Sequence, residues 1–593
     1  MIKEYVISKK KFNSLILSLL CIFMLSLKNS NGKSMIINSS SGSSIFYLIV
    51  FYYLFLKSIE FYNENSIKFE IILAFIFACS VSVGKELLDY GTIMFKYKNL
   101  YFNIFGLTLL FFAILVSFIN YLPTIHNNLY NFKLNKFTNK LFELNEKQIF
   151  WITFLLFMIC WLPAFLALYP GYLSYDGPGQ IADYFVRNKL NAWHPIVHTM
   201  TLVWCFKIGN FIFGNYAAGL TLHCLIQAII SALVLAYLVI SMIRWKLPKI
   251  LVILSILFLG FNPIIQVFVF TTTKDVIFGA LFLLVILYTM DIVYNSNQFF
   301  SSNFYIIRYV LSVIIMSLFR KQGIFVFIFF VPIFIYVAKV YWKKAVIISL
   351  ISISFVFAFF GPISDSLGII PGPISETLSV PLQQIARVMN INPDSLTTEE
   401  KKEVYNYLSE ETLKKYIPEI SDPIKADFNL DEFNKNKIEF FKLYLNIGMK
   451  NLGIYIDSFL YGNLGYFYPS TEGINQWGYL MYYHSPLEIN INQNSLFPLY
   501  LKYLMIAGND LFRSIPILSF FVAQYCPFWI FMIVLMILLK QKKYDLLIPL
   551  SFTILYWLSL LLGPVCCIRY AYPLLISVPL IISFPFINCN RKD

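Results

Sequence analysis

Long apolar runs recur along most of this chain, and they limit the folds that it can adopt. A helix needs about 20 apolar residues to cross the ~30 Å hydrocarbon core of a bilayer. The composition agrees, because 58 % of the 593 residues are hydrophobic and 13 % are charged, against roughly 25 % charged in a soluble domain. We therefore expect an all-α, polytopic membrane protein rather than a soluble enzyme with one anchor.

About fourteen of these runs are long enough to be predicted as membrane spans. They lie near residues 13–29, 44–57, 69–84, 100–121, 148–168, 215–243, 249–270, 276–294, 304–319, 323–341, 345–361, 514–539, 544–562 and 570–587. The first run follows a basic head without a small-residue cleavage site after it, so we expect a retained helix.

Basic residues in the short loops set the predicted orientation. With these spans, the following basic groups fall on one side: residues 9–11, Lys133, Lys136, Lys140, residues 244–249, 339–344, 540–543 and 591–592. Positive loops face the cytoplasm, so this side is predicted to be cytoplasmic. The net charge of +14 is spread over such loops, which argues against a nucleic-acid partner.

One further run, residues 195–213, is long enough to cross but would reverse this scheme. Counting it as a span would move the basic loop at 244–249, and every later one, to the outer side. We therefore expect an amphipathic or half-inserted helix on the outer face. Lys85, Lys96 and Lys98, on a predicted outer loop, weigh against the scheme.

The spans divide the chain into four predicted regions. These are additional N-terminal membrane helices (1–147), a transmembrane core with an outer loop at 169–214 (148–361), a mixed and mainly helical extracytoplasmic segment (362–512), and C-terminal membrane helices (513–593). In the third region, Thr397 and Glu400 have the spacing of a capping box. The nine cysteines show no disulfide or zinc framework.

Charged residues collect where predicted spans end on the outer side. They are Asp176 in "YLSYDGPGQ", Lys274 and Asp275 in "TTTKD", Arg320 and Lys321 in "FRKQG", and Arg569 in "CCIRY". The span interiors hold almost no ionisable residue beyond His223. Ion-coupled transporters keep charges near the bilayer midplane, so the pattern favours chemistry at the outer interface.

Transfer of a sugar from a polyprenyl phosphate has matching requirements. It needs a base for the acceptor, cations for the phosphate leaving group and an apolar groove for the isoprenoid. Asp176 is the candidate base. Lys274, Arg320, Lys321 and Arg569 are the candidate cations, and arginine suits bidentate phosphate contacts.

These features resemble the GT-C superfamily of polyprenyl-phosphate-sugar glycosyltransferases. The resemblance rests on Asp176 in the first large outer loop, on His194 and Pro195 before an apolar helix that ends near Phe213-Gly214, and on a second acid, Asp275. It is most similar to the protein O-mannosyltransferase and aminoarabinose-transferase types. The fragments "YPGYLSYD", "WHPIVHT", "TTTKD", "FRKQG", "PLQQIARV" and "IRYAYPLL" further resemble an uncharacterised bacterial branch and lie within residues 148–587.

The resemblance implies a GT-C-like helical bundle in a bacterial cell membrane, with its active site on the extracytoplasmic face. It implies an inverting transfer with Asp176 as general base, and Asp275 as a second acid that orients the acceptor or binds a metal. The substrate-binding candidates are His194, His198, Lys274, Arg320, Lys321, Gln384, Arg387, Arg569 and Tyr570. The partners would be a polyprenyl-phosphate sugar, a cell-envelope glycan or lipid acceptor, and membrane lipid.

The chain departs from the usual pattern in one respect: Gly-Pro-Gly follows Asp176, without an adjacent Glu. Some members of the superfamily use a divalent cation such as magnesium or manganese and others do not, so the resemblance leaves metal use open. No DxD motif is present, and we assign no metal ligand.

Structural alternatives stand beside these assignments. Asp176 could cap a helix among turn-forming residues. Lys274, Arg320 and Lys321, at the ends of predicted spans, could be interfacial anchors. Gln384 and Arg387 could line the site or pack in an amphipathic helix. The aromatic stretch at 461–484, with Tyr466, Tyr468 and Trp477, suits an acceptor site or an interfacial belt. The rival functions are a lipid-linked glycan flippase or exporter, and a non-catalytic envelope-assembly protein.

Overall fold

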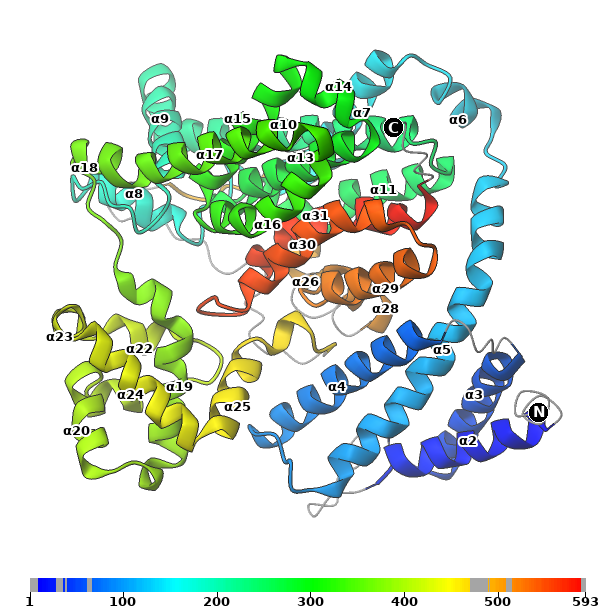
Figure 1. Cartoon of the computed structure of the whole chain (residues 1–593). Coiled ribbons are helices and arrows are strands. Elements are labelled where there is room, and N and C mark those ends of the chain that lie inside the picture. Colours follow the sequence, from blue (N-terminus) through cyan, green and yellow to red (C-terminus); the bar gives the residue numbers. More distant parts are fainter. Residues whose placement is uncertain are drawn as a thin grey trace. The chain divides into compact units, whose positions relative to one another are not determined.

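The computed structural model of the chain describes residues 9–27, 36–37, 40–60, 67–469, 489, 491–507 and 515–587. Every regular element in these residues is helical, and pairing between extended segments is limited to isolated bridges. The all-α prediction is therefore confirmed for the described residues. The chain forms two compact units (Figure 1), which are described separately below.

Unit 1 comprises residues Met1–Asn131, Val380–Pro469 and Met532–Lys542. Its elements are α2 (Lys10–Leu25), α3 (Ser41–Glu60), α4 (Lys68–Tyr90), α5 (Lys98–Tyr130), α19 (Ser379–Ile391), α20 (Thr398–Tyr407), α21 (Glu410–Lys414), α22 (Asp422–Ala426), α23 (Leu430–Lys435), α24 (Lys437–Lys450), α25 (Leu452–Gly462) and the last part of α29 (Cys526–Lys540). The predicted capping box is present at the start of α20, where Thr397 and Glu400 cap each other's backbone N–H groups.

A polar network joins the first two chain segments of unit 1, Met1–Asn131 and Val380–Pro469. Arg387, in α19, donates to the carbonyl of Gly91 and to the hydroxyl of Tyr416. Asp457, in α25, accepts from the hydroxyl of Thr92 and the backbone N–H of Ile93. These bonds attach α19 and α25 to the loop that follows α4, so they serve the packing of this unit.

Unit 2 comprises residues Phe132–Ser379, Ser470–Phe531 and Lys543–Asp593. Its main helices are α7 (Glu146–Ala167), α8 (Gly177–Phe185), α9 (Ile196–Phe213), α10 (Tyr216–Arg244), α11 (Lys249–Phe261), α12 (Pro263–Val269), α13 (Lys274–Tyr294), α15 (Asn303–Phe319), α16 (Gln322–Ala338), α17 (Trp342–Ala358), α26 (Pro498–Ile506), α28 (Pro516–Val522), α30 (Leu547–Leu560) and α31 (Ile568–Ser583), with short α6 (Lys136–Leu141), α14 (Ser296–Ser301) and α18 (Ser364–Ser366). Helix α13 is central and packs against α10, α15, α30 and α31 (Figure 1).

Local sequence explains where the helices of unit 2 begin and bend. Asn145 forms a capping box with Gln148 at the start of α7, which satisfies N–H groups that have no partner within the helix. Gly214 adopts a left-handed conformation (φ 67°) between α9 and α10, which a residue with a Cβ resists. At Asn262-Pro263 the predicted span 249–270 breaks into α11 and α12, bent by 55°, because proline cannot continue the hydrogen-bond ladder.

Nine helices among the described residues are long and apolar enough to cross a membrane, or ten if the bent α11–α12 pair is one span. In this count the stretch Gln322–Ser366 is a single candidate span. It contains two helices, α16 and α17, which pack against each other across a turn at Lys339. Three shorter apolar helices correspond to further predicted spans: Asn303–Phe319, Cys526–Lys540 and Tyr544–Leu560. The chain is therefore a multi-pass helical membrane protein.

Helix α9 covers the run that we expected to lie on the outer face. It has 18 residues and qualifies as a candidate span by length and composition. It forms a tight hairpin with α10, in which Gly209 contacts the backbone of Gly219. The structure contains no membrane, so the outer-face placement of residues 195–213 stays a prediction.

Candidate functional site

The site is built where the loop at residues 169–177 meets the start of α13. The backbone N–H of Tyr172 donates to the carbonyl of Phe270 (2.8 Å), and that of Thr272 donates to the carbonyl of Tyr172 (3.0 Å). Gly177 lies so close to Thr272 that a Cβ would fall 2.3 Å from the threonine hydroxyl oxygen. This close approach brings Asp176, the residue before Gly177, to the first turn of α13.

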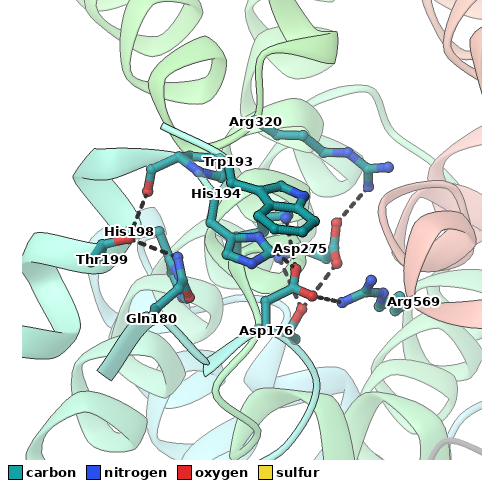
Figure 2. A network of polar contacts seen from close by, with 12 residues as sticks. Asp176, Gln180, Trp193, His194, His198, Thr199, Asp275, Arg320 and Arg569 are labelled. Atoms are coloured by element: carbon teal, nitrogen blue, oxygen red, sulfur yellow. Dashed lines mark hydrogen bonds and ion pairs between the residues drawn. The ribbon is translucent and has the colours of Figure 1, made fainter. Parts of the chain in front are cut away.

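Asp176 is surrounded by cationic and imidazole nitrogens (Figure 2). Its Oδ2 lies 2.7 Å from Lys274 Nζ and 3.6 Å from His194 Nδ1, and its Oδ1 lies 3.1 Å from Arg569 Nη1. Asp176 occupies the N-cap position of α8, but its side chain makes no capping hydrogen bond there. The carboxylate is therefore committed to the ion pairs rather than to the helix end.

Asp275 forms the second half of the cluster and has no exposed side-chain surface. One oxygen pairs with Arg320 Nη1 at 2.5 Å, and the other accepts from the Thr273 hydroxyl at 2.9 Å. Arg320 also donates to the hydroxyl of Tyr556 (3.1 Å), and its guanidinium lies 4.5 Å from the centre of the Tyr570 ring. A carboxylate in the first turn of α13 is favoured by the helix dipole.

These five residues, Asp176, Lys274, Asp275, Arg320 and Arg569, are called the acid–base cluster below. It contains two carboxylates and three cations in mutual ion pairs. His194 adds no charge near neutral pH, because burial, opposed by Asp176, lowers its pKa to about 4. The cluster thus carries one excess positive charge in a largely buried place. Such a charge is costly without a counter-ion, so the cluster is suited to bind an anion.

Asp176 is ionised at all ordinary pH values. Burial by itself raises its pKa, but the charges of Arg569 and Lys274 prevail and hold the pKa well below its usual range. A carboxylate in this state is a weak base. Its basicity depends on how firmly the two cations are held by Asp176.

Aromatic rings enclose the Arg569 side chain. Its guanidinium lies 4.9 Å from the centre of the Tyr175 ring and 4.8 Å from that of Tyr570, and it donates to the Tyr570 hydroxyl at 3.0 Å. Tyr175 has a positive φ of 56°, a conformation that is unfavourable for a residue with a bulky side chain. The strained residue directly precedes Asp176, which pairs with Arg569.

A second, uncharged network holds α8 against α9. Gln180 donates to the Thr199 hydroxyl (2.8 Å), and its amide oxygen lies 2.9 Å from His198 Nδ1. The imidazole rings of His198 and His223 meet edge to face, with ring centres 5.7 Å apart. Because Gln180 Oε1 can only accept, His198 carries its proton on Nδ1. His198, a predicted substrate ligand, is fully buried and forms part of this packing.

The remaining predicted residues lie at different places. Lys321 donates to the Ala192 carbonyl at 3.5 Å and lies 4.9 Å from the centre of the Phe360 ring, so it contacts the loop that carries His194. Gln384 and Arg387 belong to unit 1, where Gln384 binds the Tyr455 carbonyl and the Tyr444 hydroxyl. Tyr466 and Tyr468 also belong to unit 1, and Trp477 lies outside the described residues.

The two carboxylates do not fit a divalent cation. Asp176 lies against Lys274 and Arg569, and Asp275 lies against Arg320. A metal ion at either acid would face these positive charges at close range. Among the described residues, no group of three or more His, Cys, Asp or Glu side chains could hold a metal ion.

Sequence reasoning did not assign Tyr175, Gln180, Trp193 or Tyr556 to the site. Tyr175 and Trp193 adjoin Asp176 and His194, so their position next to candidate residues was the available signal. Tyr556 lies in an apolar helix, and nothing in its local sequence marks it. Its contact with Arg320 arises only from the packing of α30.

The fold and the cluster define a multi-pass helical membrane protein with a buried, net positive polar site at the start of its central helix. The chain belongs to a family of unknown function, DUF6020, whose family model matches residues 181–592. The matched range includes His194, Asp275, Arg320 and Arg569, and it begins shortly after Asp176. No curated protein and no solved structure matches the chain.

Proposed function

We propose that this protein is a GT-C-like membrane glycosyltransferase, which transfers a sugar from a polyprenyl phosphate to a cell-envelope glycan or lipid acceptor. The observation that carries the proposal is the excess positive charge of the acid–base cluster in a membrane protein. A lipid-linked phosphate would supply the missing negative charge. Its isoprenoid chain would stay in the bilayer beside the helices.

The proposed site faces the extracytoplasmic side. Helix α10 begins beside the loop at 169–177, where the Thr221 hydroxyl donates to the Pro170 carbonyl at 2.9 Å. The same helix, which has 29 residues, ends at Arg244, in the basic loop at 244–249. Basic loops favour the cytoplasmic side of a membrane, which assigns the opposite end of α10, and the cluster with it, to the outer side.

In the proposed reaction, the oxygen of an acceptor hydroxyl attacks the anomeric carbon of the donor sugar. The bond between that carbon and the phosphate oxygen breaks, and its electron pair leaves with the polyprenyl phosphate. Asp176 takes the hydroxyl proton as general base. Attack from the face opposite to the leaving group inverts the configuration. Lys274, Arg569 and Arg320 stabilise the negative charge that grows on the phosphate.

Donor binding would also activate the base. In the free protein, Lys274 and Arg569 hold the pKa of Asp176 well below its usual range. A bound phosphate competes with Asp176 for both cations, which weakens these ion pairs and raises the pKa of the carboxyl toward its ordinary value. Asp176 then becomes a better base only when a donor is present.

The test compares Asp176→Asn with a matched variant, Asp291→Asn, whose acid lies at the other end of α13. We expect Asp176→Asn to lower sugar transfer by about 10²- to 10⁴-fold, as for loss of a general base, while Asp291→Asn retains transfer. Cell-surface glycans are compared by mass spectrometry, with the amount of each variant in the membrane measured by immunoblot.

Unchanged glycans in Asp176→Asn cells, at a normal level of the protein, would contradict the proposed glycosyltransferase activity. A flippase whose Asp176 is only structural would retain its function in this variant. An assembly protein would keep its function in Asp176→Asn and in an Asp275 variant that still folds and reaches the membrane, and it would fail when residues 362–512 are deleted. The three classes are thereby separated.

A further inference from the structure

We propose that the indole of Trp193 is the stacking platform for the sugar ring of the bound donor. This inference rests on the proposed function and names a sugar subsite beside its phosphate site. Trp193 is 58 % exposed, although it lies in the loop that carries His194 to the acid–base cluster. A large aromatic ring left open at the edge of a polar site offers a flat apolar face on which a ligand can pack.

The backbone of Trp193 and of its neighbours is held by hydrogen bonds and close packing. The neighbouring Ala192 N–H donates to the Ile370 carbonyl at 2.7 Å, and Gly372 packs on the backbone of Ala192 and Trp193. The N–H of Trp193 itself donates to the Asn191 side chain at 3.2 Å. The backbone that carries the indole is therefore fixed in advance, which reduces the conformational entropy lost when a ligand covers the ring.

The indole lies one ring away from the charged groups. It is stacked on the imidazole of His194, with ring centres 6.1 Å apart and planes 11° apart (Figure 2). The same imidazole lies 3.6 Å from Asp176. A ligand whose phosphate contacts Lys274 and Arg569 would therefore bring the group attached to that phosphate next to His194 and the indole face.

The indole of Trp193 and the polar groups of His194 and Asp176 together favour a sugar as the ligand. One face of a pyranose ring carries C–H bonds that pack on an aromatic face, while its hydroxyl groups need polar partners. Here the indole supplies the flat apolar face. His194 and the carboxylate of Asp176 supply polar atoms beside it. An isoprenoid chain would pack on the indole but would offer no hydrogen bond to His194, whose Nδ1 makes none with the described residues.

The test uses the full-length protein in lipid nanodiscs. The probes are undecaprenyl phosphate and a panel of the same lipid carrying glucose, galactose, mannose or N-acetylglucosamine, with affinities measured by native mass spectrometry. We expect at least one sugar-bearing lipid to bind the wild type about 3- to 10-fold more tightly than the bare lipid phosphate, as for one aromatic stacking contact.

Two variants of Trp193 separate stacking from membrane anchoring. Trp193→Leu keeps an apolar side chain without a ring, so we expect it to lose the preference for the sugar-bearing lipid. Trp193→Phe keeps a ring and should retain most of it. Neither should change the affinity for bare undecaprenyl phosphate. Trp204→Leu is the matched control, since Trp204 is 61 % exposed on α9 and should leave all affinities unchanged.

The outcomes distinguish the two proposals. A wild-type protein that binds undecaprenyl phosphate but prefers no sugar-bearing lipid refutes the sugar platform and leaves the proposed phosphate site standing. A Trp193→Leu protein that keeps the wild-type preference refutes the platform in the same way. A wild-type protein that binds none of these lipids refutes the proposed function, and the platform with it.

Discussion

Helices α13 and α15 are joined by an Asp–Arg ion pair at each end, yet the two ends differ in charge balance and in exposure. At one end Asp275 pairs with Arg320, next to Asp176, Lys274 and Arg569. At the other end Asp291 pairs with Arg308 at 2.7 Å and accepts from the Tyr237 hydroxyl at 3.1 Å. The Asp291 side chain is 30 % exposed, whereas that of Asp275 is fully buried.

The difference shows how a structural ion pair is told from a candidate site. The Asp291–Arg308 pair has one charge of each sign, and the Arg308 guanidinium is covered on either side by Tyr288 (4.2 Å) and Tyr305 (4.3 Å). Its charges need no further ligand. The acid–base cluster has an unbalanced cation in a buried place, which favours a bound anion. The four predictions below test this contrast.

The largest expected effect is on stability. Asp275→Asn leaves Arg320 buried without its counter-ion, so we expect the free energy of unfolding to fall by about 3–5 kcal/mol. Asp291→Asn should cost only about 1 kcal/mol, because its pair is partly exposed. Unfolding by SDS in mixed micelles measures both. The double variant Asp275→Asn/Arg320→Gln should recover part of the loss. Equal losses of unfolding free energy in Asp275→Asn and Asp291→Asn would contradict the proposed difference between the two ends.

The second effect is on anion binding. Arg569→Gln removes a charged donor from the cluster, so we expect the affinity for undecaprenyl phosphate to fall by about 10- to 100-fold, as for one charge-assisted hydrogen bond. The matched variant Arg308→Gln, at the balanced end, should bind the lipid as the wild type does. Native mass spectrometry in nanodiscs gives both affinities. Equal losses in the two variants would mean that the lipid phosphate does not select the cluster.

The third effect is on the pH dependence of stability. Burial lowers the pKa of His194 from 6.5 to about 4 despite the nearby Asp176. Below pH 6.5 the unfolded chain therefore gains a proton that the folded protein does not take up. This one group should contribute a fall in the free energy of unfolding of at most ~1.4 kcal/mol per pH unit between pH 6.5 and 4. His194→Gln should remove this contribution and make the fall less steep in that window.

Asp176 provides an internal comparison for this experiment. Its pKa is held well below 3.8, so its stabilising ion pairs persist throughout the same window and are lost only at more acidic pH. A His194→Gln protein whose stability still falls as steeply as the wild type between pH 6.5 and 4 would show that another group binds the proton.

The smallest effect concerns the end of α13 and α15 where Asp291 pairs with Arg308. Tyr305→Leu removes one of the two rings over Arg308, and we expect the free energy of unfolding to fall by about 0.5–1 kcal/mol, the size of a cation–π contact. Tyr305→Phe should be neutral, since it keeps the ring. Sugar transfer should be unchanged in both variants. A clear loss of transfer in Tyr305→Leu would show that this end acts on the cluster.

The helical elements of the membrane part were predictable because each depends on a local run of apolar residues. The spans predicted at 148–168, 276–294 and 304–319 became α7, α13 and α15, with ends that agree closely. The break in the span 249–270 was also encoded locally, by Asn262-Pro263. The hairpin formed by α9 and α10 depends on a glycine contact between two helices, which no single run shows.

The site was predictable only as a set of residues at predicted span ends. Asp176, Lys274, Asp275, Arg320 and Arg569 all carry charges beside apolar runs, which is a signal in the sequence. The same signal is carried by Arg308 and Asp291, which form a balanced pair elsewhere. Arg387 was predicted as a substrate ligand as well, and its two Nη groups donate to Tyr416 and Gly91 within unit 1.

The sequence by itself determined that this chain is a multi-pass helical membrane protein. An apolar run that crosses lipid must satisfy its own backbone polar groups, and a helix does so within the run. Only the tertiary structure decided which charges meet. Asp176 and Lys274 are 98 positions apart and Arg569 lies near the C-terminus, yet all three share one ion-paired cluster. Electrostatic energy depends on distance in space and on burial, and neither quantity can be obtained from positions along the chain.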